Sequence, residues 1–186
     1  MREIATAIYT FDELSNKAKK VAIENEARSN TESRWYHFLL EDWKDRLALA
    51  GFLHADIYFS GFCSQGDGAC FDATIDLKHW IKDGSFGSLE KYIEWIRADI
   101  TIINHHYSHS GTRNVDLSFL IESEVWMDAS LLVLEKLIDR QRRDLCEEIY
   151  QALEAEYNHL TSEDFCVQYF KEDGCEFYED GTRFYE

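Results

Sequence analysis

Apolar residues recur every three or four positions in several stretches of the chain, which is the spacing of one face of an α-helix. We expect helices over residues 10–22 and 30–50, and a much longer helix near residues 124–158 that forms the spine of the fold. Thr10 and Glu13 have the spacing of a capping box at the start of the first helix. Shorter helical patterns cover residues 79–82, 88–98 and 162–173.

Other stretches are β-branched or alternate between apolar and polar residues, as strands with one buried face do. They cover residues 4–9, 54–62, 69–77, 100–108 and 115–121, and a small C-terminal hairpin over residues 175–185 turns at Asp180 and Gly181. We therefore predict an α+β fold in which an antiparallel sheet of about four strands has helices packed on one face. No linker composition interrupts the chain, so residues 1–186 are expected to form a single domain.

Glycines, small polar residues and aromatic residues gather in residues 58–71, at the tip of the first predicted hairpin. If the turn comprises residues 65–68, Cys63 lies opposite Cys70 and Phe62 lies opposite Phe71. The side chains of Ser64, Gln65 and Asp67 then make the tip a candidate contact site for a partner. The alternative is a tight turn in which these side chains bond only to the local backbone.

The sequence of this tip lacks the residues that known phosphate-binding and nucleophilic sites require. A phosphate-binding loop requires Gly-Lys-Ser/Thr at its end, and Asp67 would repel a phosphate. Ser64 does not stand in a Gly-x-Ser-x-Gly elbow before a helix. Cys63 and Cys70 have no histidine beside them in the sequence; they are open to interpretation as buried apolar residues, a disulfide, or a nucleophile and its partner. We predict no catalytic residue and no cofactor.

Three histidines lie close together at positions 105, 106 and 109. Imidazoles suit zinc and other transition ions. On a strand, however, His105 and His109 share a face and His106 points away, so two ligands converge at most unless Asp72, Asp116 or His54 joins from a neighbouring strand. We therefore interpret this segment as a polar strand end and predict no metal.

The chain carries 19 basic and 36 acidic residues, a net charge of -17 at pH 7. Direct binding to nucleic acids or anionic membranes depends on lysine and arginine, so this charge argues against such ligands and favours a basic partner. After residue 121 the chain has 18 acidic and 6 basic residues. This surface either keeps the protein soluble or imitates the phosphates of a duplex. The candidate partner-binding acids are Glu147, Glu148, Glu154, Glu156, Glu163, Asp164, Glu172 and Asp173.

Five cysteines without a Cys-x-x-Cys pair fit a reducing compartment better than a disulfide framework. The N-terminus resembles no signal peptide, and no apolar segment approaches the length that a bilayer requires. We therefore expect a cytoplasmic protein that does not interact with membranes.

Residues 59–71, Phe-Ser-Gly-Phe-Cys-Ser-Gln-Gly-Asp-Gly-Ala-Cys-Phe, resemble a poorly characterised family of bacteriophage and prophage proteins. The resemblance extends to an opening like Tyr-Thr-Phe-Asp-Glu-Leu-Ser at residues 9–15 and to an acidic tail like Phe-Tyr-Glu-Asp-Gly at residues 177–181. The chain departs from the family at Phe62, Cys63 and Cys70, where tryptophan or serine is expected. The resemblance implies a phage source and no settled activity.

Together, the charge and the resemblance favour a non-enzymatic phage protein that inhibits a host nucleic-acid-handling defence complex of the CRISPR or restriction type. The expected partner is a basic host protein or ribonucleoprotein in the host cytoplasm, bound by mimicry of nucleic acid. A small hydrolase-like or ligand-binding domain centred on residues 61–71, with His54, His79, His105 or His106 nearby, is one alternative. A structural or regulatory phage protein that self-associates through residues 124–158 is another.

Overall fold

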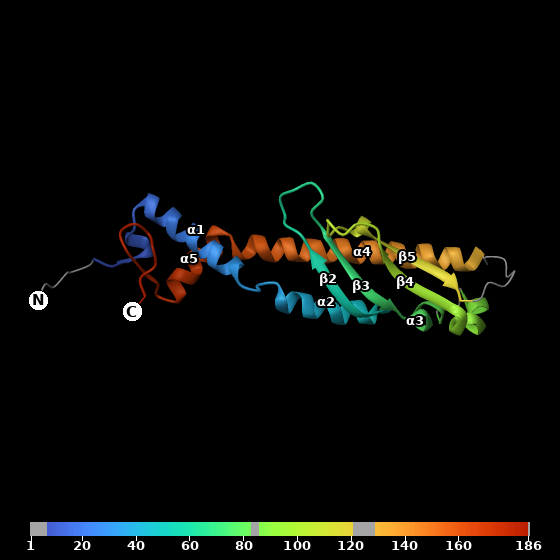
Figure 1. Ribbon diagram of the computed structural model, residues 1–186. Coiled ribbons are helices and arrows are strands. Elements are labelled where there is room, and N and C mark those ends of the chain that lie inside the picture. Colours follow the sequence, from blue (N-terminus) through green and yellow to red (C-terminus); the bar gives the residue numbers. More distant parts are fainter. Residues whose placement is uncertain (1–6, 83–85, 121–128, 186) are drawn as a thin grey trace, which may run out of the picture. The chain divides into compact units, whose positions relative to one another are not determined.

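The computed structural model describes residues 7–82, 86–120 and 129–185 (Figure 1). These residues belong to two compact units, one within residues 1–37 and 154–186 and the other within residues 38–153. We call them the terminal unit and the central unit. The single domain expected over residues 1–186 stays a prediction.

The central unit contains two hairpins and the helices that pack with them (Figure 1). Its elements are α2 (His37–Leu49), β2 (Phe52–Phe59), β3 (Ala69–Ile75), α3 (Leu77–Ile81), the 3-10 helix η2 (Gly87–Trp95), β4 (Ile96–Ile102), the 3-10 helix η3 (Ser110–Thr112), β5 (Arg113–Phe119) and most of α4 (Ala129–Leu160). Apolar side chains from the helices and both hairpins are buried, among them Trp43 and Leu47 of α2, Phe52 and Phe71 of the first hairpin, and Ile138 and Ile149 of α4. Each contributes about 1.5–3 kcal/mol by leaving water.

The fold is mixed α and β, as predicted, but the sheet of about four strands is not confirmed. The described strands form three antiparallel sheets of two strands each: β2 with β3, β4 with β5, and β1 with β6. β3 and β4 lie near one another, yet no ladder of backbone hydrogen bonds joins them. The sequence pattern showed which residues face a core, but it did not show which strands pair beyond each hairpin.

The predicted register of the first hairpin is wrong. Tyr58, and not Cys63, lies opposite Cys70, and Ile57, and not Phe62, lies opposite Phe71. The reason is that β2 ends at Phe59 and residues 60–68 form a wide loop in place of a tight turn. Residues 96–98 were also assigned wrongly, because they begin β4 and do not end a helix.

The long helix predicted near residues 124–158 is present as α4, which begins at Ala129 in the described part of the chain and ends at Leu160. Residues 124–128 lie outside the described residues. One buried position of α4 is charged: Arg142 is fully buried in line with Ile138, Leu145 and Ile149. This spacing of three and four residues places an arginine where the pattern otherwise calls for an apolar residue.

The terminal unit joins the two ends of the chain. Its elements are β1 (Tyr9–Thr10), the 3-10 helix η1 (Phe11–Glu13), α1 (Asn16–Glu32), the last turns of α4, α5 (Glu163–Glu172) and β6 (Glu176–Phe177). The Thr10 backbone N–H donates to Glu13 Oε2 at 2.8 Å, as the capping-box spacing predicts, but this box starts η1. α1 itself begins after Ser15, whose Oγ accepts from the Ala18 N–H, and it continues to Glu32, so the second helix starts at His37 and not near residue 30.

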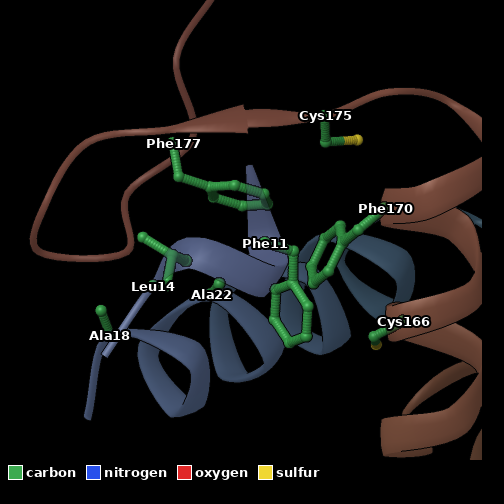
Figure 2. Packing of buried hydrophobic residues seen from close by; sticks show 8 residues of the cluster. All are labelled: Phe11, Leu14, Ala18, Ala22, Cys166, Phe170, Cys175 and Phe177. Atoms are coloured by element: carbon green, nitrogen blue, oxygen red, sulfur yellow. The ribbon is translucent and has the colours of Figure 1, made fainter. Parts of the chain in front are cut away.

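A cluster of buried side chains holds the terminal unit together (Figure 2). The ring centroids of Phe11 and Phe170 are 5.2 Å apart, and those of Phe170 and Phe177 are 5.0 Å apart. Aromatic pairs at these separations stabilise a core beyond their area of burial. The predicted C-terminal hairpin is present, with Phe177 bridged to Arg183 and Gly181 at φ +90° in the turn.

Candidate functional site

The loop at residues 60–68 connects β2 and β3 and extends beyond their ends (Figure 1). Its shape is fixed from within by Asp67, whose Oδ2 accepts from the backbone N–H groups of Cys63 and Ser64 at 2.9 and 2.6 Å. Ser60 adds a bond from the Gly68 N–H to its Oγ at 3.2 Å. The carboxylate of Asp67 is therefore occupied by the loop itself and is poorly placed to contact a partner.

The loop is also held by residues from the connection between β4 and β5. A Cβ on Gly68 would lie 2.7 Å from the Cβ of His109 and 2.9 Å from its Cα, so only glycine fits at this approach. The ring of Tyr107 lies 3.5 Å from where a Cβ of Gly66 would be, which is ordinary van der Waals contact, and it is the φ of +103° that favours glycine at this position. Packing therefore explains Gly68 and backbone conformation explains Gly66, without any ligand.

A third support comes from α4. The hydroxyl group of Tyr150 donates to the Gly61 carbonyl at 3.2 Å, and its ring lies 5.6 Å from that of Phe62. The remaining side chains at the tip are those of Cys63, Ser64 and Gln65, which are exposed. Of the predicted contact residues, Ser64 and Gln65 are thus presented to solvent, and Asp67 is structural.

His109 contacts this loop, but the other histidines expected near it do not gather there. The strand end predicted at residues 105–109 is wrong, because β4 ends at Ile102 and these residues form the connection to η3. His109 packs on Gly68, and its Nδ1 accepts from the Gly111 N–H at 3.1 Å, which turns that nitrogen away from metal binding. His79 lies against Gly51 and Trp80 instead, and His54 belongs to β2. Within the residues that the structure describes, no group of three or more histidine, cysteine or acidic side chains could hold a metal ion.

The two cysteines that flank the loop are in different environments. Cys63 is exposed, whereas Cys70 is fully buried in β3, and burial raises the pKa of its thiol. A buried neutral thiol is a poor nucleophile because the thiolate is the reactive form. The observed register also removes the cross-strand pairing of Cys63 with Cys70 that a disulfide or a dithiol site would need.

The predicted acidic residues differ in their exposure. Glu147 and Glu148 are exposed on α4 in the central unit, whereas Glu154 and Glu156, later on the same helix, are partly buried in the terminal unit. A partly buried carboxylate has less freedom to meet a basic partner. These two residues are therefore weaker candidates than the pattern suggested.

Four further acids belong to α5 and its end. Glu163 and Asp164 are exposed in the first turn, where the helix dipole favours negative charge, and Ser162 caps that end by accepting from the Phe165 N–H. Glu172 and Asp173 are exposed at the other end. There Gln168 donates to Glu172, and Arg183 lies 3.2 Å from Asp173.

A network of buried and partly buried charges in the central unit is not among the features predicted from the sequence. Arg142 donates to Asp139 Oδ1 at 2.8 Å and to the carbonyl oxygens of Ser110 and Arg113. Arg113 in turn donates to Asp72 Oδ1 at 2.6 Å. These bonds tie α4 to β5, and β5 to β3. An arginine in the apolar stripe of α4 was the one available signal, and its role is positioning.

The same helix also covers the backbone of β5. Glu135 Oε2 accepts from the Leu117 N–H at 3.0 Å, while Arg142 Nη2 donates to the Arg113 carbonyl at 2.8 Å. Side chains of α4 thus satisfy donors and acceptors that an edge strand otherwise leaves open. These two backbone groups of β5 are accordingly unavailable for pairing with another strand.

Comparison with known proteins adds a partial family match. A family model described as "Domain of unknown function (DUF8835)" matches residues 35–95, less than half of the chain. The matched segment includes the loop at residues 60–68, and it fits the expectation of an uncharacterised family. No curated protein and no solved structure matches the chain. Within the described residues, every helix is too short or too polar to cross a bilayer.

Proposed function

We propose that this protein is an acidic, phage-encoded binding protein that inhibits a host nucleic-acid-handling defence complex, such as a CRISPR effector or a restriction enzyme. The net charge of -17 is the observation that carries the proposal. A basic groove that normally holds DNA or RNA attracts such a surface over several ångströms and releases its counterions when the surface binds. The protein then acts in the host cytoplasm by occupancy and needs no catalytic residue.

The exposed acids that best fit this role are Glu147 and Glu148 on α4 and Glu163 and Asp164 on α5. Their side chains are exposed, and no described residue forms an ion pair with any of the four. Unpaired carboxylates keep their full charge available to a partner. Asp173 is a weaker candidate, because Arg183 already neutralises part of its charge.

The test uses purified CRISPR effectors and restriction enzymes, whose DNA binding and cleavage are measured with and without this protein. We expect inhibition of at least one of them, competition with its DNA, and loss of inhibition as salt rises from about 0.05 to 0.5 M because screening shortens the reach of the charges. The double reversals Glu147→Lys/Glu148→Lys and Glu163→Lys/Asp164→Lys should each weaken the inhibition at least about tenfold, which is about 1.4 kcal/mol.

The matched control is Glu24→Lys/Glu32→Lys, which changes the net charge by the same amount at two exposed positions of α1. If the control weakens inhibition as much as the test variants do, net charge and not a defined surface is responsible. Inhibition that is insensitive to salt and to all the reversals would contradict nucleic-acid mimicry.

Self-association through α4 is a second candidate function, because one stretch of that helix exposes apolar side chains. Leu132, Val133 and Leu137 are 37%, 56% and 45% exposed among the described residues. Two such patches that meet would bury this area from water. Sedimentation should then show an oligomer that persists at high salt and dissociates in Val133→Glu/Leu137→Glu, and a monomer at all concentrations would contradict it.

A further inference from the structure

The central unit has a pocket of about 470 Å³ at α3 and η2. Lys78, Ile81 and Lys82 line it from α3 and its end, and Lys91 and Ile93 line it from η2. This volume lies within the range of small-molecule sites. All of the lining residues fall within residues 35–95, the segment that the family model matches.

Three lysines line this pocket in a chain where acids outnumber bases by 36 to 19. The side chains of Lys78, Lys82 and Lys91 form no ion pair within the described residues, although Lys91 Nζ lies 4.8 Å from the centre of the Tyr92 ring. Lys44 and Lys171 have carboxylate partners, whereas Lys17 and Lys20 of α1 form no ion pair with a described residue either, so what sets the pocket lysines apart is that three of them line one hollow. Like charges that line one pocket repel one another, and a bound anion would relieve that repulsion.

The other lining residues restrict the kind of anion. Glu90 and Glu94 add two carboxylates to the three ammonium groups, so the charges of the described lining residues sum to only +1. A bare anion would be repelled by the glutamates, whereas a ligand with hydroxyl groups can donate hydrogen bonds to them. Ile81, which is buried, and Ile93 provide an apolar surface for a carbon skeleton.

We propose that this pocket binds a small phosphomonoester that also carries hydroxyl groups, such as a sugar phosphate or a nucleoside monophosphate. Lys78, Lys82 and Lys91 bind the phosphate, which carries a charge of about -1.5 to -2 at neutral pH and accepts several hydrogen bonds. Glu90 and Glu94 accept from the hydroxyl groups. Such a site is independent of the acidic surface and of any host partner.

The experiment is a titration of the isotope-labelled full chain, followed by NMR, with ribose 5-phosphate, adenosine monophosphate, inorganic phosphate and ribose. At least one of the two phosphomonoesters should shift the resonances of residues 77–95 with a Kd below about 1 mM, and ribose should not. Lys78→Ala/Lys82→Ala should weaken binding at least about tenfold, because two charged donors to the phosphate are removed. Glu90→Gln/Glu94→Gln should reduce the preference for the phosphomonoester over inorganic phosphate.

Lys17→Ala/Lys20→Ala, which removes two lysines of α1, is the matched control and should leave the Kd unchanged. The proposal fails if no phosphomonoester shifts these resonances, or if the control weakens binding as much as the pocket variant does. It also fails if inorganic phosphate binds as tightly as the phosphomonoesters, because the site is then a simple anion site. Circular dichroism of each variant shows whether it is folded.

Discussion

At the scale of single residues, burial decides which cysteines can react. Cys63 is exposed, while Cys70, Cys146, Cys166 and Cys175 are buried, and burial raises the pKa of the Cys146 thiol to about 12. We therefore expect iodoacetamide to modify the native protein at Cys63 alone at pH 8, and all five cysteines once the protein is unfolded in urea. Mass spectrometry of the peptides measures this. Rapid modification of Cys70 or Cys146 in the native protein would show that the central core is more open than described.

The ionisation of Asp139, which pairs with the buried Arg142, makes the stability of the fold depend on pH. Burial raises the pKa of this carboxyl group, but hydrogen bonds from Arg143 and Arg142 outweigh burial and the pKa is lowered overall. The folded state therefore holds the ionised form more strongly than the unfolded state does. This contribution to stability is complete above the unfolded pKa, about 3.9, and is lost as the pH falls through the lower folded pKa.

Replacing Asp139 tests how much its ionised carboxylate stabilises the fold. Asp139→Asn should lower the free energy of unfolding by roughly 3 kcal/mol at pH 7, because Arg142 then lies buried without a carboxylate. The difference from the parent protein should shrink as the pH falls to about 3 and below. Urea unfolding at several pH values measures it, with the exposed Asp144→Asn as the control. A difference that does not change with pH would mean that the charge of Asp139 is unimportant.

At the scale of elements, turns and loops show what the sequence could predict and what it could not. The helix from Ser162 and the turn at Gly181 follow from capping and glycine chemistry within a few residues, and both were predicted. The loop at residues 60–68 is bonded internally by Asp67 and contacts Tyr107 and His109. Two of those residues come from a different hairpin, so no local pattern contains the information.

Two glycines of the terminal unit allow the cost of backbone strain to be separated from the cost of a steric clash. Both have a positive φ, +90° at Gly181 and +61° at Gly174, but a Cβ at Gly181 would overlap the Ala18 carbonyl group while a Cβ at Gly174 would meet nothing within 4 Å. Gly174→Ala should therefore cost only about 1 kcal/mol of backbone strain. Gly181→Ala should cost several times more, as measured by thermal unfolding. Equal losses would mean that the close approach to α1 is relaxed at little cost.

At the scale of the whole molecule, the sequence predicted the mixed fold and the long helix, because periodic patterns sum over many residues. It could not predict the charge network, since Arg142 is stabilised by carbonyl groups at positions 110 and 113 that a pattern does not reveal. It also missed the lysine pocket, whose residues come from two short elements. The acidic surface was visible from composition alone, but the structure was needed to separate exposed acids from those that are partly buried.

The terminal unit has a core built in equal parts from the two ends of the chain. Phe11, Leu14, Ala18 and Ala22 come from the start, and Cys166, Phe170, Cys175 and Phe177 come from the end (Figure 2). During synthesis the first four residues leave the ribosome well before the last four, at about 5–20 residues per second. The central unit can therefore fold as it emerges, whereas the apolar side chains of the first segment wait several seconds for the partners that bury them.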